Sequence, residues 1–258
     1  MTFADVALAR RLEAAEADNA RGCTSRPPGA AVLEAAGGCA IFAGGDSPLT
    51  HAVGIGLDGP VPAREIDRIE AFFRSRGARV SIDLCPLADP GLLQALAERG
   101  YRATEFNNVL VRRLAGAEIV PAPRVRRAAP EEGELWSHTV GSGFFEGHQL
   151  TAEEMDVGRA IFAAPGAMCY LAMAGVDEPA GGAALAFHGG LATLFADSTL
   201  AHFRRQGIHR ELISARLNEA IAQACDLATA STLPASSSQR NYERQGFEVV
   251  YTKVTLVR

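Results

Sequence analysis

Several features that would assign the chain to a specialised class are missing from its 258 residues. The five cysteines are odd in number and include no C-x-x-C pair, so a disulfide framework is not expected and a reducing compartment fits. No apolar run approaches the roughly 20 residues that a membrane-spanning helix needs. The opening segment, MTFADVALARRLEAAEADNARG, reads as an amphipathic charged helix and not as a secretion signal. These absences predict a cytoplasmic protein with no membrane partner.

The chain also lacks an excess of basic residues. Its 25 Lys and Arg residues are outnumbered by 30 Asp and Glu, which gives a formal net charge of −5. General nucleic-acid binders usually carry a basic domain, so a nucleic-acid partner is not predicted. No His-x-x-x-His or Cys–His cluster is found, so no metal site is predicted. The composition is that of an ordinary globular protein, long enough for one large or two modest domains.

The first half of the chain predicts alternating helices and strands. A helix is expected over 3–21, ended by Gly22 and by Pro27 and Pro28. The other elements expected here are a helix over 62–76 with Ile66, Ile69 and Phe73 on one face, a helix over 90–99, and strands over 31–35, 39–42, 49–57, 79–84 and 105–114.

The second half predicts a similar mixture after a linker. Residues 115–124 (AGAEIVPAPR) contain two prolines and little pattern. A strand-like run from Leu191 leads through a turn into a helix with apolar positions Ile208 and Leu212. The other expected elements are strands over 125–127, 168–174, 182–188, 227–231 and 247–257, and helices around 131–142, 152–163 and 237–244. We therefore predict an α/β fold with a mixed, largely antiparallel sheet flanked by helices.

A faint internal repeat predicts two tandem domains. When the first half is shifted by 146 positions, Arg64-Glu65-Ile66 falls on Arg210-Glu211-Leu212, and Gly100-Tyr101 falls on Gly246-Phe247. The order helix, strand, helix, Gly-aromatic, strand is the same in both halves. We interpret residues 1–114 and 125–258 as two related domains joined by the linker at 115–124.

The turn at 204–209 (RRQGIH) predicts an anion site. Backbone N–H groups at a helix start have no partner within the helix, and the helix dipole favours negative charge there. Gly207 allows a ligand to approach the backbone closely, and arginines can add charge-assisted hydrogen bonds. The alternative is a basic helix start on the surface, which is disfavoured because cations are unfavourable at this end of a helix. The residues expected to hold the anion are Arg204, Arg205, Gln206, Gly207, Ile208, His209 and Arg210.

The corresponding turn in the first half predicts that this site is not duplicated. Residues 58–63 (DGPVPA) fall on 204–209 under the same shift, and Pro60 and Pro62 remove two N–H donors. Asp58 stands where the second half has an arginine. We expect the first half to keep the fold without a cofactor site.

A second glycine motif suggests a different ligand. The segment 54–59 (GIGLDG) satisfies G-x-G-x-x-G, and Asp83 follows about 24 residues later. In dinucleotide-binding folds the helix begins within this motif, whereas here Pro60 and Pro62 occupy the first turn. A dehydrogenase is therefore disfavoured. A nucleophile-elbow hydrolase is weaker still, because Gly141-Ser142-Gly143 lacks the G-x-S-x-G spacing.

Two paired motifs in the second half resemble those of the GNAT N-acetyltransferase superfamily. Arg204-x-x-Gly207-x-His209 is similar to its [Arg/Gln]-x-x-Gly-x-[Gly/Ala] helix start, and 242–247 (YERQGF) is similar to its Tyr-x-x-x-Gly-Phe segment. His209 departs from the final small residue, and Ala201 stands where proline is frequent. The resemblance is strongest to bacterial members with two tandem domains, here with a degenerate N-terminal half.

This resemblance implies a function and roles for residues. Acetyl-CoA would be the co-substrate, and its pyrophosphate would bind the turn that contains Gly207. Tyr242 would protonate the departing thiolate, because a phenol pKa near 10 is close to that of a thiol. The strand residues Asp197, Ser198, Thr199 and Leu200 would align the pantetheine and stabilise the oxyanion. Ser237 and Asn241 are expected beside the cofactor, although a serine at this position is explained more simply as the cap of its helix.

The predicted reaction is direct transfer of the acetyl group to an amine in a ternary complex. The acceptor could be a small molecule or a peptide, and the oligomeric state is not indicated. Glu146, Glu153 and Glu154 lie where the family often builds its acceptor site, but solvated charges on helix surfaces are the favoured interpretation and no base is named. The alternative function is a non-catalytic module that binds acyl-CoA.

Overall fold

The computed structural model describes residues 4–25 and 29–258. Helix α1 (Val6–Gly22) begins where the Asp5 carboxylate accepts a hydrogen bond from the backbone N–H of Leu8 at 2.7 Å. The start expected at Phe3 and the stop expected at Pro27 and Pro28 lie outside the described residues. None of the described helices combines the length and the apolar character that crossing a bilayer requires.

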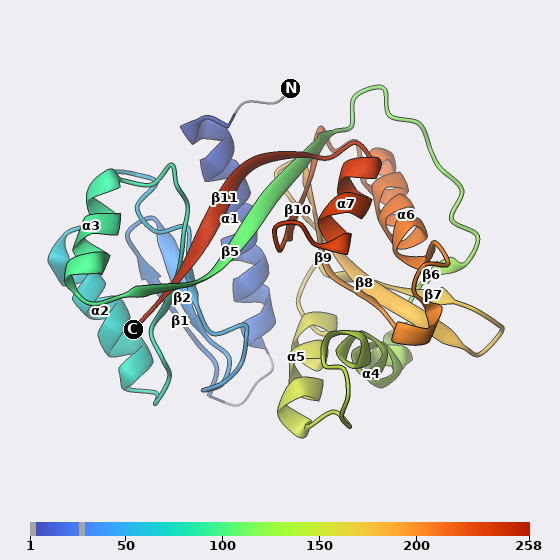
Figure 1. Cartoon of the computed structure of the whole chain (residues 1–258), viewed down its shortest axis with the longest axis horizontal. Coiled ribbons are helices and arrows are strands. Elements are labelled where there is room, and N and C mark those ends of the chain that lie inside the picture. The colour runs from blue at the N-terminus through green and yellow to red at the C-terminus, as the bar shows by residue number, and fades with distance from the viewer. Residues whose placement is uncertain (1–3, 26–28) are drawn as a thin grey trace. The chain divides into compact units, whose positions relative to one another are not determined.

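The chain forms two structural units, which Figure 1 shows with their elements labelled. Unit 1 comprises Met1–Leu110, Ser231–Ser236 and Val249–Arg258, and unit 2 comprises Val111–Ala230 and Ser237–Glu248. This division differs from the single break expected at 115–124. The reason is strand β11 (Glu248–Val257), which pairs with a strand of the first half.

The sheet of unit 1 has the order β1-β2-β3-β4-β11-β5. Its strands from the first half are β1 (Ala31–Ala35), β2 (Gly38–Phe42), β3 (Ala52–Val53), β4 (Ser81–Leu84) and β5 (Arg102–Arg113). The β1–β2, β2–β3 and β4–β11 pairs are antiparallel, whereas β3 and β4 are parallel. Helix α2 (Ala63–Arg74) connects the parallel pair, and α3 (Pro90–Glu98) connects β4 to β5.

The apolar face of α2 forms much of the core of unit 1. Ile66, Ile69 and Phe73 are all buried, as predicted from their spacing. They belong to one cluster with Ile82 of β4 and Leu96 of α3. Each such buried side chain contributes about 1.5–3 kcal/mol, so this cluster fixes the helices on the sheet.

The strand predicted over 49–57 is much shorter in the structure. Strand β3 contains only Ala52 and Val53. Gly54 and Gly56 have φ angles of +74° and +81°, which turn the backbone out of the extended conformation. The G-x-G-x-x-G motif therefore forms an irregular segment that ends before α2 begins at Ala63.

The sheet of unit 2 has the order β10-β9-β8-β7-β6. Its strands are β6 (Val125–Arg127), β7 (Met168–Met173), β8 (Pro179–His188), β9 (Leu191–Thr199) and β10 (Leu227–Thr232), and its helices are α4 (Gly133–Phe144), α5 (Ala152–Phe162), α6 (Ile208–Ala222) and α7 (Ser237–Arg244). The β6–β7, β7–β8 and β8–β9 pairs are antiparallel. The β9–β10 pair is parallel and is connected by α6, as β3 and β4 are by α2.

The element bounds agree with the predicted repeat. Shifted by 146 positions, α2 falls on 209–220 and α3 on 236–244, next to the observed α6 and α7. Strand β4 falls on 227–230, at the start of β10. Strand β1 falls on 177–181, which does not overlap β7. The reason is that the β7–β8 hairpin of unit 2 is longer than the β1–β2 hairpin of unit 1. The prediction of two tandem α/β domains is confirmed at the level of the fold.

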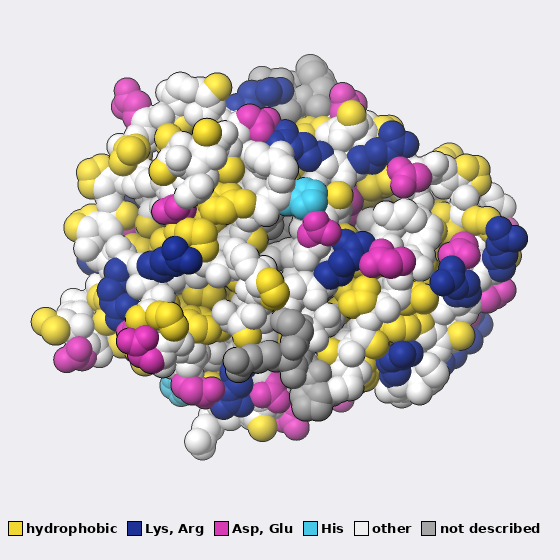
Figure 2. All heavy atoms as spheres, turned by 180° about the vertical axis from the view of Figure 1, so that it is seen from behind, with side chains coloured by type: hydrophobic (Ala, Val, Ile, Leu, Met, Phe, Trp, Pro, Cys, Tyr) yellow, Lys and Arg dark blue, Asp and Glu magenta, His cyan; other side chains and the backbone are white. Residues whose placement is uncertain are grey.

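Figure 2 shows one face of the molecule with side chains coloured by type. Basic and acidic side chains are interspersed over this face, with hydrophobic side chains between them. Arginines line a cavity in unit 2.

Candidate cofactor site

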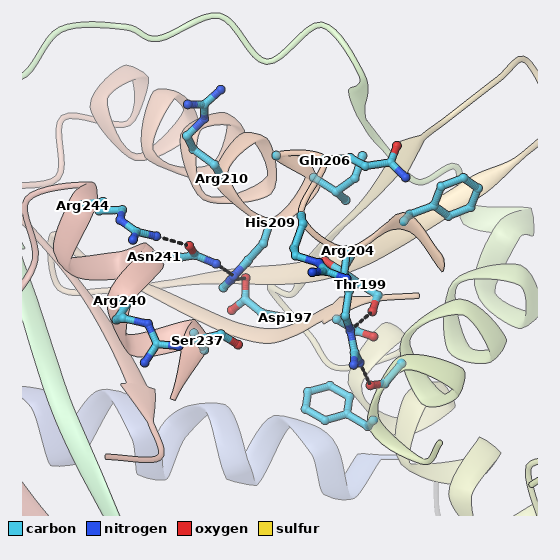
Figure 3. Close-up of a pocket in the computed structure, with 18 residues that line it drawn as sticks. Asp197, Thr199, Arg204, Gln206, His209, Arg210, Ser237, Arg240, Asn241 and Arg244 are labelled. Atoms are coloured by element: carbon cyan, nitrogen blue, oxygen red, sulfur yellow. Dashed lines mark hydrogen bonds and ion pairs between the residues drawn. The ribbon is translucent and has the colours of Figure 1, made fainter. Parts of the chain in front are cut away.

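A cavity of about 990 Å³ lies in unit 2, where β9 ends and α6 begins (Figure 3). Two residues expected at the site, Leu200 and Tyr242, do not line it. The backbone N–H of Leu200 bonds to the carbonyl of Ala180 instead. The expected residues that do line the cavity are Asp197, Ser198, Thr199, Arg204, Arg205, Gln206, Gly207, Ile208, His209, Arg210, Ser237 and Asn241.

A β-bulge in β9 shapes one wall of the cavity. Ala184 pairs with Phe195 while Gly182 pairs with Ser198, so β9 has one extra residue at this point. Ala196 adopts a left-handed φ of +54° within the bulge. The buried hydroxyls of Ser198 and Thr199 have no hydrogen-bond partner among the described residues. Such buried orphan groups are rare unless water or a ligand satisfies them.

The start of α6 presents unpaired backbone donors to the cavity. Gly207 is the N-cap at φ +82°, and no side chain caps the helix. The backbone N–H of Glu211 donates a hydrogen bond to the carbonyl of Gly207 at 3.1 Å, which is the first hydrogen bond of the helix. In the part of the chain that the structure describes, the preceding N–H groups of Ile208, His209 and Arg210 have no backbone acceptor. They are the free donors that the sequence predicted at this helix start, and such donors are suited to an anion.

Five arginines line the cavity, and Asp197 is its single acidic residue among those described. Arg204 is held by the carbonyls of Thr199 and Gly143, at 3.2 and 3.3 Å, and by the Glu146 carboxylate. The guanidinium of Arg210 extends away from His209 in Figure 3. The other three are Arg205, Arg240 and Arg244.

Sequence reasoning missed Arg240 and Arg244. Both lie on α7, four residues apart, and therefore on one face of that helix. Nη1 of Arg244 donates to Oδ1 of Asn241 at 3.5 Å. This spacing within QRNYER was a usable signal, because Asn241 between them was already expected at the site.

Asp197 anchors a buried network beneath the cavity floor. Its carboxylate accepts the hydroxyl proton of Tyr242 at 2.6 Å and is paired with the fully buried guanidinium of Arg216. Arg216 also donates to the carbonyls of Leu212 and Ala184, at 2.9 and 3.0 Å. Burial alone would raise the pKa of Asp197, but Arg216 and His209 outweigh it and hold this pKa well below its usual range. Asp197 is thus an ionised carboxylate that orders the strand end.

Tyr242 is 1% exposed, and its hydroxyl points to Asp197. Its ring packs edge-on against Phe247 and His209, with centroids 4.9 and 5.6 Å apart. Burial and then the Asp197 charge raise its pKa well above 10. Its role as an acid stays a prediction, and in this structure its proton is held by Asp197.

His209 fills the position at which the superfamily has glycine or alanine. Its Nε2 lies 3.2 Å from Oδ1 of Asp197, and its Nδ1 lies 3.0 Å from the amide nitrogen of Asn241. If Nδ1 accepts from that amide, the ring proton is on Nε2 and faces the carboxylate. Figure 3 shows Asn241 between Arg244 and His209, so α6 and α7 are connected through these side chains.

The three glutamates considered as a base have different surroundings. Glu146 is paired with Arg204. Glu154 accepts from the backbone N–H of Thr151 at 2.8 Å, in the capping box of α5, and also contacts His148. These contacts lower the pKa of Glu154, the Thr151 backbone having the largest effect. Glu153 is exposed in the first turn of α5. The arrangement does not single out one of them.

The counterpart turn in unit 1 has the opposite charge arrangement. Oδ1 of Asp58 lies 3.1 Å from Nε of Arg10, whose guanidinium also donates to the carbonyl of Leu57. Pro62 is the N-cap of α2 and has no N–H to offer. A carboxylate and a proline thus stand where unit 2 presents arginines and free donors.

No protein-family model and no curated protein matches the sequence. Solved structures with a similar fold include a GCN5-related N-acetyltransferase from Kribbella flavida, at a TM-score of 0.70 and 20% identity, covering 97% of this chain and 95% of that one. A tandem GNAT protein from the clavulanic acid biosynthesis pathway has a TM-score of 0.62 and 14% identity, covering 98% of this chain and 93% of that one. A GCN5-related N-acetyltransferase from Sphaerobacter thermophilus covers 70% of this chain and 59% of that one, at a TM-score of 0.52 and 14% identity.

These similarities define the fold class as that of the GNAT acetyltransferases. The match to the clavulanic-acid protein extends over both units, so the arrangement is specifically the tandem one. The resemblance stated from the paired motifs is therefore confirmed for the fold.

Proposed function

We propose that the chain is an acyltransferase whose unit 2 binds acetyl-CoA and transfers the acetyl group to an amine. The observation that carries the proposal is the start of α6, where unpaired backbone donors and five arginines surround one cavity. A pyrophosphate is a polyanion that such a site binds well. The motif resemblance and the fold favour CoA over other phosphate-bearing ligands.

In the proposed complex, the pyrophosphate lies against the N–H groups of Ile208, His209 and Arg210. Arg205 supplies further charge from the turn, and Arg240 and Arg244 supply it from α7. The pantetheine follows the bulged end of β9, where Ser198 and Thr199 have unsatisfied hydroxyls. A backbone N–H at this strand end would stabilise the oxyanion.

The proposed chemistry is direct attack. The amine nitrogen forms a bond to the thioester carbonyl carbon and the C–S bond breaks, so that the thiolate takes up a proton and the amine loses one. Tyr242 is the proposed proton donor to the thiolate. Transfer from an ordinary phenol of pKa about 10 to a thiolate of pKa about 8.5 is uphill by about 2 kcal/mol. Burial and the Asp197 charge raise the pKa of Tyr242 well above that ordinary value, so in the observed arrangement the transfer costs more. The Tyr242 hydroxyl donates its proton to Asp197 in a hydrogen bond. We therefore expect that Tyr242 can protonate the thiolate only after this hydrogen bond breaks.

The proposed acceptor is an amine of a small molecule or of a peptide. The protein is proposed to act in the cytoplasm, without nucleic-acid or membrane partners. The second candidate function is a module that binds acyl-CoA without turnover. One observation favours it: the Tyr242 hydroxyl is engaged by Asp197 and does not line the cavity.

The test combines CoA binding with thiol release. Arg210→Glu places a negative charge beside the proposed pyrophosphate site, and Arg64→Glu makes the same change at the matching position of unit 1, where Arg64 is exposed. We expect Arg210→Glu to weaken CoA binding by at least about 10-fold in calorimetry, since a charge-assisted pair contributes about 1.5–3 kcal/mol, while Arg64→Glu leaves it unchanged. Equal affinities would place the site elsewhere. Release of free thiol from acetyl-CoA across an amine panel then distinguishes the enzyme from the binding module.

A further inference from the structure

A cluster of polar side chains in unit 1 faces helix α1. Ala52 of β3 pairs with Ile82 of β4, and both lie in the apolar core with α2. Because side chains alternate along strands, His51 and Asp83 share the opposite face of the sheet. Thr255 of β11 pairs directly with Asp83 and donates its hydroxyl proton to Oδ1 at 2.7 Å.

Helix α1 contributes carboxylates to the same cluster. Ala17 packs with Val53 of β3, so this part of α1 lies against that face of the sheet. Glu13 and Glu16, three residues apart on α1, both accept from Nζ of Lys253, at 3.2 and 2.6 Å. Lys253 is the single lysine of the whole sequence, and it is buried.

His51 presents a buried nitrogen lone pair to these carboxylates. Its Nδ1 lies 3.2 Å from the backbone carbonyl of Pro48, and because a carbonyl can only accept, Nδ1 carries the proton. Nε2 is buried and has no hydrogen-bond partner among the described residues. Oδ2 of Asp83 lies 3.9 Å from it. A histidine oriented by a carbonyl through one nitrogen, with the other free, is the arrangement of a metal ligand.

The charges of the cluster do not balance. Glu13, Glu16 and Asp83 offer three carboxylates, and Lys253 supplies one positive charge. Three carboxyl side chains therefore surround one ammonium group. The side chains of Glu16 and Asp83 are 33% and 19% exposed, so water offsets part of this negative excess and a bound cation would offset it more fully.

We propose that Glu16, His51 and Asp83 bind a divalent transition metal, with zinc as the favoured ion. Their ligand atoms lie within 4.8 Å of one another. Zinc takes nitrogen and carboxylate oxygen at about 2.0–2.2 Å, which puts tetrahedral ligands roughly 3.3 Å apart. The ligand atoms would have to approach one another only slightly, and a change in the side-chain conformation of Glu16 can supply this movement. Water would complete the coordination.

This site differs from the sequence-based expectation of no metal. The spacing of Glu16, His51 and Asp83 along the chain matches no metal motif, because the ligands come from a helix, the segment before β3 and strand β4. The inference concerns unit 1 and is independent of the acetyltransferase proposal.

The test is calorimetric titration of the full chain, stripped of metal by a chelator, with zinc chloride. We expect one zinc ion per chain, with affinity reduced more than about 100-fold in His51→Gln and in Asp83→Asn, since loss of an outer partner alone costs 10–100-fold. The control His138→Gln removes an exposed histidine of unit 2 and should bind as the parent chain does. Magnesium, which prefers oxygen ligands, should bind much more weakly.

A second measurement needs no variant. Cobalt(II) added to the metal-free chain should give visible d–d bands of a low-coordinate nitrogen–oxygen site, and zinc should displace them. Absence of zinc binding to the parent chain, binding that survives both substitutions, or cobalt bands of thiolate type would each overturn the proposal. The last result would assign the metal to cysteines instead.

Discussion

The ion pair of Asp197 and Arg216 makes a quantitative prediction. Asp197→Asn keeps the shape of the side chain and removes its charge, leaving the guanidinium of Arg216 buried without a counter-ion. Breaking a buried pair from one side costs about 3–5 kcal/mol. The carbonyls of Leu212 and Ala184 still accept from Arg216, so we expect the lower end, about 3 kcal/mol.

The assay is urea unfolding followed by tryptophan fluorescence. Trp136 is the single tryptophan of the sequence and is fully buried in α4, so it reports on unit 2. With an m-value of about 3 kcal/mol/M, the midpoint should fall by about 1 M. The control is Glu134→Gln, which breaks an exposed pair with Arg159 in the same unit and should leave the midpoint unchanged.

A double variant isolates the pair itself. The double variant Asp197→Asn with Arg216→Met leaves no buried charge without a partner. Its loss of unfolding free energy should be smaller, by at least about 1.5 kcal/mol, than the sum of the losses in the two single variants. The reasoning is refuted if Asp197→Asn costs under about 1 kcal/mol, or if the double variant is additive. Either result would mean that water or another group neutralises Arg216.

Three further predictions concern the same unit. Tyr242→Phe keeps the packing on Phe247 and should cost about 1.5–3 kcal/mol of unfolding free energy, because the lost hydrogen bond is to an ionised carboxylate. Unchanged turnover in a thiol-release assay would reject Tyr242 as the acid. Gly207→Ala forces a side chain into φ +82° and should cost about 1–2 kcal/mol in the urea assay and weaken CoA binding, whereas an unaffected midpoint would mean that the turn relaxes freely. The pKa of Asp197 is lower in the folded chain than its value of about 3.9 in the unfolded chain. Ionised Asp197 therefore stabilises the fold above about pH 3.9, and this stabilisation is lost as the pH falls toward the folded-state pKa. The stability difference between the parent chain and Asp197→Asn should therefore shrink below about pH 4, and a difference independent of pH would exclude the charge as its source.

Local patterns were enough to predict most elements and the position of the anion-binding turn. The face of α2 and the start of α6 follow from spacing and from glycine, both of which act over a few residues. The extent of β3 was overestimated, because hydrophobic character at 49–57 does not show that Gly54 and Gly56 turn the backbone. The pairing of β11 with β4 could not be predicted, since it joins residues far apart in sequence.

Side-chain partners around the cavity depend on contacts that spacing does not encode. The sequence marks Tyr242 as an aromatic at a motif position, whereas its burial and its bond to Asp197 depend on how β9 bulges. Arg216 lies within an apolar helix face and gave no signal of its own, although it is the partner that keeps Asp197 charged. The departure at His209 was visible in the sequence, but its contact with Asn241 was not.

The placement of β11 has a consequence for synthesis on the ribosome. Val254 pairs with Leu84, a separation of 170 residues, and β11 lies between β4 and β5 in the completed sheet. At about 5–20 residues per second, β4 waits roughly 10–30 s for its native neighbour. During that time its edge can pair with β5 or with another nascent chain. The N-terminal sheet, although its first strands are translated early, is therefore completed only after β11 has been translated.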